Sequence, residues 1–373
     1  MIDLEFSEQE VLLQRTAVEF FISECPLAKV RELEDSELGY APQLWKKMAD
    51  LDWVGLSLPE EDGGAEGSLL DLYVLYLELG RALVPTPHLT SSVIAGETLA
   101  RVGSPEQRKL VSQIATGDLI VATALMESDG DYGPEAVQLS ATPGDAGGYR
   151  LEGTKLLVPW AHVAGRLLVA TRTGPGPDGT TLLLVDPSAS GISLERLDNT
   201  AGYPLFAVVF DGAEVAADAV VGEVNRGWET LTPALDRATV LQCAEIVGAG
   251  EAVLEMSLDY AKEREQFGQA IGKFQAVQYL CSDIAIDLHL TSLLARQAAW
   301  RVDSALPYQR ELALAKAQAA EASQLMVRQA HEVYAGHGFM LETDLQLYTR
   351  RAKHWQFNLG EASHHFEAAV DAL

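Results

Sequence analysis

The side chains best suited to recognising a ligand follow one another closely after position 263. They are an arginine, two glutamines and two phenylalanines: Arg264, Gln266, Phe267, Phe274 and Gln275. A guanidinium fork can bind a pyrophosphate through parallel hydrogen bonds, and amides beside an aromatic ring suit an adenine. Gly268 would let a preceding helix end at this point. The alternative is a helix C-terminus that carries a cation matched to the helix dipole.

A second candidate is the segment 334–339, where glycines stand at positions 336 and 338. Gly336 and Gly338 permit left-handed backbone and the close approach of a ligand. An ordinary turn between two helices is the competing interpretation, and this segment alone favours it.

Composition narrows the class of protein. The 373 residues carry a formal net charge of −27, and such an acidic surface repels nucleic acid, so any phosphate-bearing ligand needs local cations. Three scattered cysteines, and His364 adjacent to His365, give no metal or disulfide spacing. No apolar run reaches the roughly 20 residues of a membrane span, and the acidic start resembles neither a secretory signal nor a transit peptide. We expect a soluble, cytoplasmic protein.

The hydrophobic pattern changes twice along the chain, which predicts an α+β protein. Helical spacing dominates residues 1–118, short Val- and Thr-rich strands separated by turns follow in 119–225, and helical spacing returns in 226–373. Ser7 and Glu10 predict a capping box at the first helix. The middle segment predicts an antiparallel barrel or sandwich, with a hairpin across residues 174–179. Long helices are expected over 235–265, 274–302 and 309–334.

Together these motifs resemble the acyl-CoA dehydrogenase family. The family pattern Y-x-x-x-R-x-Q-F-G followed by I-x-x-F-Q-x-x-Q is matched at every position, namely Tyr260, Arg264, Gln266, Phe267, Gly268, Ile271, Phe274, Gln275 and Gln278. The later pattern G-G-x-G-F and E-x-D-L-x-L-Y-x-R-R-A is matched from Gly336 to Ala352, except that Ala335 replaces the first glycine. No G-x-G-x-x-G motif follows a strand, so a doubly wound dinucleotide fold is excluded.

The resemblance implies an N-terminal helical domain, a β-domain and a C-terminal four-helix bundle that forms tetramers. It further implies FAD as cofactor, an acyl-CoA substrate and an electron-transfer flavoprotein as acceptor. FAD would lie between two subunits, and the residues facing its ADP part would be Arg264, Gln266, Phe267, Phe274, Gln275, Gly336 and Gly338. The implied reaction removes a proton from the α-carbon of the thioester and a hydride from the β-carbon.

The positions that carry this chemistry in the family are altered. The two usual positions of the catalytic glutamate read Leu359 and Ala238, and neither can act as a base. Residues expected to hold the flavin ring are also replaced: Leu157 stands for a tryptophan, Pro159 for a hydroxyl residue, and 126–131 departs from the family's T-E-P-G-A-G-S-D. Nearby carboxylates could substitute for the base; Asp236 is the first candidate, followed by Glu245 and Glu361.

Several functions remain open at this level. The chain could be an active dehydrogenase with a relocated base, or the non-catalytic partner in a heterotetramer of the kind that acts on ring-bearing acyl-CoAs. A desulfinase or oxidase variant of the fold, or a protein without cofactor, are the remaining alternatives.

Overall fold

The computed structural model describes residues 6–128, 130, 132–144 and 147–373. The N-terminal part is helical, with the helices α1 (Glu8–Glu24), α2 (Leu27–Glu34), α3 (Pro42–Asp50), α4 (Leu69–Arg81), η2 (Leu89–Gly96), α5 (Glu97–Val102) and α6 (Pro105–Ala115). The predicted capping box is confirmed, because the Glu10 amide donates to the Ser7 hydroxyl and the Ser7 amide donates to the Glu10 carboxylate. Helices α4 and α6 begin with the same capping box, which provides hydrogen-bond acceptors for backbone amides at the helix N-terminus.

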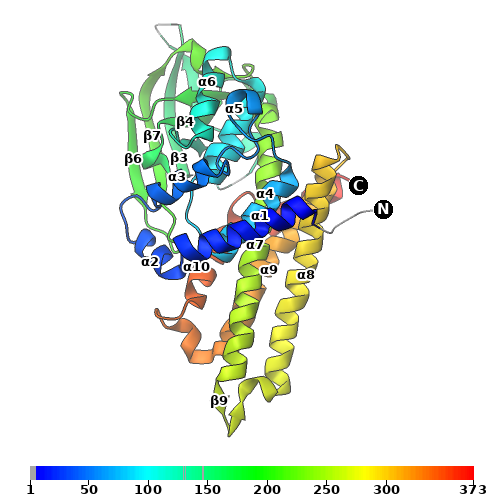
Figure 1. Cartoon of the computed structure of the whole chain (residues 1–373). Coiled ribbons are helices and arrows are strands. Elements are labelled where there is room, and N and C mark those ends of the chain that lie inside the picture. Colours follow the sequence, from blue (N-terminus) through cyan, green and yellow to red (C-terminus); the bar gives the residue numbers. More distant parts are fainter. Residues whose placement is uncertain (1–5, 129, 131, 145–146) are drawn as a thin grey trace.

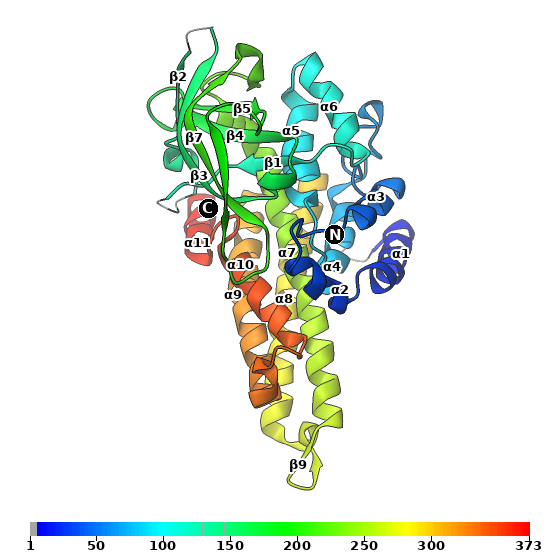
Figure 2. The same ribbon diagram turned by 90° about the vertical axis from the view of Figure 1, so that its left-hand side faces the viewer.

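The middle part is a twisted sheet (Figures 1 and 2). Its strands are β1 (Val121–Ala124), β2 (Ser140–Pro143), β3 (Tyr149–Pro159), β4 (Arg166–Arg172), β5 (Thr180–Val185), β6 (Ile192–Leu197), β7 (Leu205–Val215) and β8 (Val220–Val221), in the order β6-β7-β3-β2-β4-β5-β8. The predicted hairpin is confirmed as β4–β5. The expectation of a wholly antiparallel sheet is wrong, because β1 and β2 each pair with β4 in parallel.

The C-terminal part consists of the long helices α7 (Gly227–Glu263), α8 (Gln275–Asp303) and α9 (Gln309–Tyr334), followed by α10 (Leu345–Phe357) and α11 (Ala362–Asp371). Helix α7 begins eight residues earlier than the spacing predicts, and it continues through Pro233. Figure 1 shows α7 and α8 running side by side to a small hairpin at the far tip of the molecule.

Helix α4 crosses α7 at very short range. A Cβ built on Gly80 would lie 1.9 Å from the Glu245 carbonyl oxygen, and one on Gly248 would lie 1.7 Å from that of Leu77. Glycine is therefore required at both positions, since no side chain fits between the two backbones. This contact fixes the position of α7 along its own axis relative to α4.

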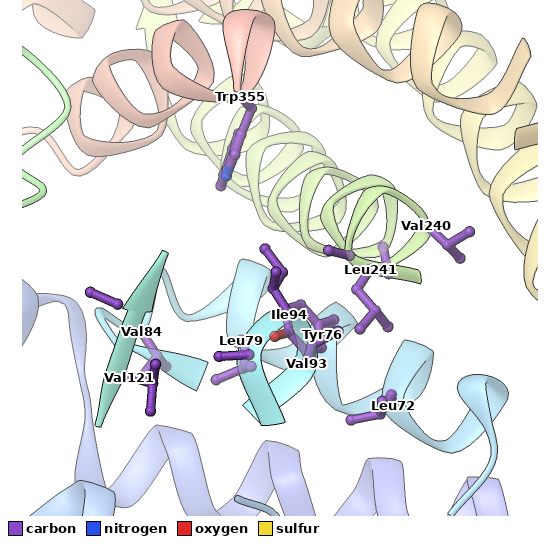
Figure 3. Close-up of a cluster of buried hydrophobic side chains, with 14 of the residues drawn as sticks. Leu72, Tyr76, Leu79, Val84, Val93, Ile94, Val121, Val240, Leu241 and Trp355 are labelled. Carbon is purple, nitrogen blue, oxygen red and sulfur yellow. The ribbon is translucent and has the colours of Figure 1, made fainter. Parts of the chain in front are cut away.

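One continuous hydrophobic core joins the three parts. In Figure 3, Tyr76 and Leu79 of α4 and Ile94 of η2 lie opposite α7, and Trp355 of α10 points toward the same space. Because the core crosses the positions near 118 and 225, the three-domain division of the chain stays a prediction.

Candidate functional site

A cavity of about 370 Å³ lies where the N-terminal helices, the β-sheet, α7 and the segment from α10 to α11 meet. Its wall is mainly apolar, with aliphatic side chains and two tryptophans, among them Leu79, Val84, Leu89, Ile94, Leu125, Met126, Leu156, Leu157, Leu235, Leu359, Trp160 and Trp228. Among the described residues, the wall contains no lysine or arginine. An enclosed apolar cavity with a few polar groups is the usual form of a small-molecule site.

Helix α7 contributes a regularly spaced run of polar side chains to the cavity wall. Asp236, Thr239, Gln242 and Glu245, spaced three residues apart, all lie in the wall, and we call these four residues the polar strip. Each residue neighbours the next on the helix surface, so the polar strip winds part of the way around α7. Ala238, the other expected base position, is fully buried and is not part of the wall.

Asp236, the first candidate for a replacement base, lies at one end of the polar strip. Its Oδ2 accepts a hydrogen bond of 2.8 Å from the Tyr308 hydroxyl, which belongs to the connection between α8 and α9. Burial raises the pKa of Asp236, and the Tyr308 hydrogen bond opposes the rise. The carboxyl thus reaches the cavity, but whether it abstracts a proton stays a prediction.

Glu245 forms the other end of the polar strip. The Tyr203 hydroxyl donates to its Oε1 at 3.3 Å, and the Arg351 guanidinium lies over the Tyr203 ring, 3.9 Å from the ring centre. Burial raises the pKa of Glu245, while the positive charge of Arg351 and the Tyr203 hydrogen bond lower it. Arg351 also faces Glu34 of α2 at 3.5 Å, so a buried charge chain connects the cavity to the N-terminal helices.

The other expected base position is apolar. Leu359 lies in the cavity wall with a left-handed φ of +58°, and its carbonyl accepts a hydrogen bond of 2.8 Å from His365 Nε2. Burial lowers the pKa of His365 to about 4, so this histidine is neutral near pH 7. Glu361 is exposed, binds the Ser363 hydroxyl at 2.7 Å and does not reach the wall.

At the two altered flavin positions the β-sheet contributes no side-chain hydrogen-bonding group. Leu157 and Pro159 line the cavity, and Trp160 is 2% exposed with its ring edge-on to Tyr40 and Tyr203. Glu127 serves the structure, since it accepts from Lys155 Nζ at 2.6 Å and from two backbone amides. Asp129 and Asp131, in the altered segment 126–131, lie outside the described residues.

The motif after position 263 lies at the tip of the bundle (Figure 1). Helix α7 ends at Glu263, and β9 (Glu265–Gln266) pairs with β10 (Gln269–Ala270). Gly268 therefore does not end the helix as expected; with Phe267 it forms the turn of this hairpin, and both have positive φ. Phe267 is 93% exposed.

The remaining side chains of this motif also face outward. Within the described chain, the Arg264 side chain has no hydrogen-bond or ion-pair partner, and Gln266 donates only to its neighbour's carbonyl. Gln275 is exposed and donates to the Tyr279 hydroxyl at 2.7 Å, while the Phe274 ring meets that of Phe267 edge-on. A cation, two amides and an aromatic ring are thus presented to whatever binds this tip.

The glycine turn is η8 (Ala335–Phe339) and lies beside the lower part of α7, because the Tyr260 and Tyr334 rings stack with centres 4.1 Å apart. The left-handed backbone expected at the glycines falls instead at Ala335, with φ +50° and ψ −135°. Gly338 is needed for packing, since a Cβ there would lie 2.6 Å from His331 Nδ1, whereas Gly336 is open to solvent.

The predicted site residues therefore form two separate groups in one chain. Asp236 and Leu359 meet at the cavity, while the helix-end motif and the glycine turn lie toward the opposite end of α7 (Figures 1 and 2). Sequence reasoning missed Tyr203 and His354, which line the cavity, and Tyr308, whose hydroxyl donates to Asp236 in the wall. The only available signal was the three-residue spacing of polar residues on α7.

Within the described residues, no three His, Cys, Asp or Glu side chains are grouped to hold a metal ion. In the same part of the chain, every helix is too short or too polar to cross a bilayer.

Comparison with known proteins places this geometry in context. Residues 7–118 match the model of the acyl-CoA dehydrogenase N-terminal domain, and residues 225–367 match that of the C-terminal domain. Acyl-CoA dehydrogenase FadE27 from Mycobacterium tuberculosis is 32% identical over 348 residues, which covers 91% of this chain and 90% of that protein.

Solved structures agree along the whole chain. A crystal structure of the ChsE4-ChsE5 complex from Mycobacterium tuberculosis is 30% identical with a TM-score of 0.90, covering 99% of this chain and 98% of that one. A variant of the Tcur3481-Tcur3483 steroid ACAD is also 30% identical, with a TM-score of 0.87 and coverage of 98% and 97%. The chain therefore belongs to the acyl-CoA dehydrogenase family.

Proposed function

We propose that this chain is a subunit of a heteromeric acyl-CoA dehydrogenase, in which it completes the FAD site of a neighbouring subunit and does not itself abstract the proton. The observation that carries the proposal is the separation of the two groups of residues. Arg264, Gln266 and Phe267 are intact and project from the tip of the bundle, while Leu359 occupies the expected base position in the cavity.

The residues present fit one part of FAD and not the other. The unpaired guanidinium of Arg264 can bind a pyrophosphate through two hydrogen bonds, and the exposed Phe267 ring can stack on an adenine. Leu157 and Pro159 offer no side-chain hydrogen bond to an isoalloxazine ring. Bound FAD supplies hydride acceptance in this reaction, and we assign that step to a cofactor whose ring is held by the neighbour.

The proposed substrate of the assembled enzyme is an acyl-CoA with a ring-bearing acyl group. The similarity to the Tcur3481-Tcur3483 steroid ACAD supports this class. The similarity to the ChsE4-ChsE5 complex supports an assembly of two different subunits. The neighbour would be a paralogous subunit in a heterotetramer, and an electron-transfer flavoprotein is the expected acceptor of its electrons.

The first experiment measures the visible spectrum and the FAD content per chain, for the protein alone and co-purified with its partner subunit. A colourless lone chain and a yellow complex with one FAD per two chains are expected. Two FAD per two chains, or a yellow lone chain that an acyl-CoA bleaches, would refute the proposal.

A matched pair of variants tests the clamp itself. Arg264→Ala should strip FAD from the complex, and Arg264→Lys should restore it poorly because an ammonium lacks the planar fork. Lys262→Ala removes a cation from the same helix end, where Lys262 is exposed and pairs with Asp259 at 3.0 Å. We expect this control to keep the full FAD content.

The second candidate is an active homotetramer with Asp236 as base. One observation favours it, namely the half-buried carboxyl of Asp236 in the cavity wall with a raised pKa. In that case the lone chain would bind FAD, an acyl-CoA would bleach it, and Asp236→Asn would abolish the bleaching. A lone chain without FAD would remove this candidate.

A further inference from the structure

Helix α8 has two apolar faces, and the described part of the chain covers only one of them. The inner face packs against α7 and α9 through the buried residues Cys281, Ile284, Thr291, Ala295 and Ala298. A second set of side chains is exposed along the other side of the helix, at alternating spacings of four and three residues: Tyr279, Asp283, Ile286, Leu290 and Leu293. We call these five residues the outer row.

The apolar members of the outer row are unusually open to solvent. Ile286 is 64% exposed, Tyr279 59% and Leu290 44%. In Figure 1, α8 forms the right-hand edge of the lower half of the molecule, and no other labelled element lies beyond it there. A helix that is apolar on two sides is normally buried on both, and alternating four- and three-residue steps are the spacing of a seam between paired helices. The outer row is therefore suited to contact a helix of another chain.

A groove of about 400 Å³ lies between α7 and α8, beside the outer row. Its wall is mainly apolar and includes Leu254, Leu258, Ala261, Val277, Cys281 and Ala285. Among the described residues, the one cation in the wall is Lys262, which is paired with Asp259 at 3.0 Å. A large apolar side chain on a docked helix can fill this groove and act as an anchor next to the outer row.

Two carboxylates interrupt the apolar character of this side of α8. Within the described chain neither Asp283 nor Asp287, one turn further on, has an ion-pair partner, and the pKa of Asp287 is raised by burial and by the negative charge of Asp283. The segment 274–295 contains no lysine or arginine. The next cation is Arg296, whose guanidinium lies 4.1 Å from the centre of the Phe6 ring and whose Nε is buried. The outer row thus lacks a counter-charge of its own.

This charge arrangement disfavours pairing of two identical chains through the outer row. A parallel pair of α8 helices would place Asp283 opposite Asp283. An antiparallel pair centred on the outer row would bury Asp283 against the same face, which offers no lysine or arginine. A carboxylate that is desolvated without a counter-charge costs several kcal/mol, whereas a cation on a different helix would compensate it.

We propose that the outer row of α8 docks a helix of a different subunit, which is apolar at the facing positions and carries a lysine or arginine opposite Asp283. The same carboxylate prevents the chain from pairing with itself through this row. The inference rests on the proposed function for the identity of the partner, which is the paralogous subunit. It adds the surface and the charge by which the mixed assembly is chosen over an assembly of identical chains.

Self-association of the full chain, measured by sedimentation equilibrium, tests the role of Asp283. Asp283→Leu removes the charge and completes the apolar row, so the dissociation constant for self-association should fall at least about tenfold. Glu321→Leu is the control, because Glu321 is an exposed carboxylate on α9 without an ion-pair partner in the described chain; it should leave self-association unchanged. Asp283→Asn keeps the shape of the side chain and should shift the constant in the same direction by less, and it replaces Asp283→Leu if that variant does not fold.

Binding to the co-purified partner subunit tests the expected cation. Asp283→Lys should weaken the complex at least about tenfold, because two cations would then face each other, while Glu321→Lys should not. The proposal is overturned if Asp283→Leu associates no more tightly than the unmodified chain, if both leucine variants tighten equally, or if Asp283→Lys leaves the complex intact. The FAD content of the same samples tests the proposed function separately. A lone chain that binds its own FAD would refute that function, and the sedimentation comparison, which needs neither FAD nor the partner, would still decide whether Asp283 prevents self-pairing.

Discussion

Replacing Ala335 by glycine should stabilise the protein. Ala335 has φ +50° and ψ −135°, a region that costs a residue with a Cβ about 1–3 kcal/mol. The side chain is exposed, so its removal loses little packing. Glycine makes the unfolded chain more flexible than alanine does, and this entropy offsets about 0.5–1 kcal/mol of the gain. We therefore expect a net gain of up to about 2.5 kcal/mol in the free energy of unfolding.

The expected change in melting temperature is small but measurable. An unfolding entropy of about 2.1 cal/mol/K per residue, taken over 373 residues, converts this gain into a rise of about 1–3 °C. Differential scanning calorimetry and equilibrium denaturation in urea would measure it. Ala368→Gly, inside α11, is the control and should lower stability by about 1 kcal/mol. If Ala335→Gly melted no higher than the unmodified chain, the backbone at 335 would not be strained.

The other predictions concern the buried charges around the cavity. Burial raises the pKa of Glu245 in the folded state, so the contribution of this carboxyl to stability is present at low pH and is lost as pH rises from about 4.3 through the folded pKa. Glu245→Gln should therefore gain stability relative to the unmodified chain between about pH 4.5 and 8, as measured by urea denaturation. Parallel stability–pH profiles of the two proteins would contradict this. Arg351→Met should lower the free energy of unfolding by about 3 kcal/mol, because it leaves the Glu245 carboxyl without its nearby positive charge. The control is Arg350→Met, which should cost about 1 kcal/mol or less because the Arg350 side chain is 33% exposed. Equal losses in urea denaturation would show that burial of Arg351 does not determine its contribution. Tyr308→Phe should raise the pKa of Asp236 further, because the hydrogen bond that lowers this pKa is lost. Carbon-13 NMR titration of the Asp236 carboxyl measures the change. An unchanged pKa would show that the Tyr308 hydrogen bond does not influence Asp236.

Features set by neighbouring residues could be predicted from the sequence. The Ser7 capping box, the β4–β5 hairpin and the long helices α8 and α9 are confirmed within a residue or two, because caps, turn residues and helical spacing act over short distances. Leu359 was likewise expected at the usual base position, and it does line the cavity.

What depends on contacts between distant segments could not be predicted. The parallel pairing of β1 with β4 requires the chain to return after β3, and no local pattern encodes it. Tyr203 lies between β6 and β7 and Tyr308 between α8 and α9, so only the folded chain brings them to Glu245 and Asp236. The strain at Ala335 was visible only as a departure from the family's glycine.

Helix α7 has a mechanical consequence for the molecule. Its 37 residues form an unbroken rod that is about 55 Å long at 1.5 Å per residue, with the cavity near one end and the hairpin at the other. The glycine crossing with α4 acts as a fulcrum between them, since Gly80 and Gly248 leave the two backbones no room to slide. A tilt of about two degrees at this fulcrum would displace the hairpin by about 1 Å, enough to lengthen a hydrogen bond beyond its normal range. Any change in the tilt of α7 at its cavity end is therefore amplified at the hairpin that carries Arg264.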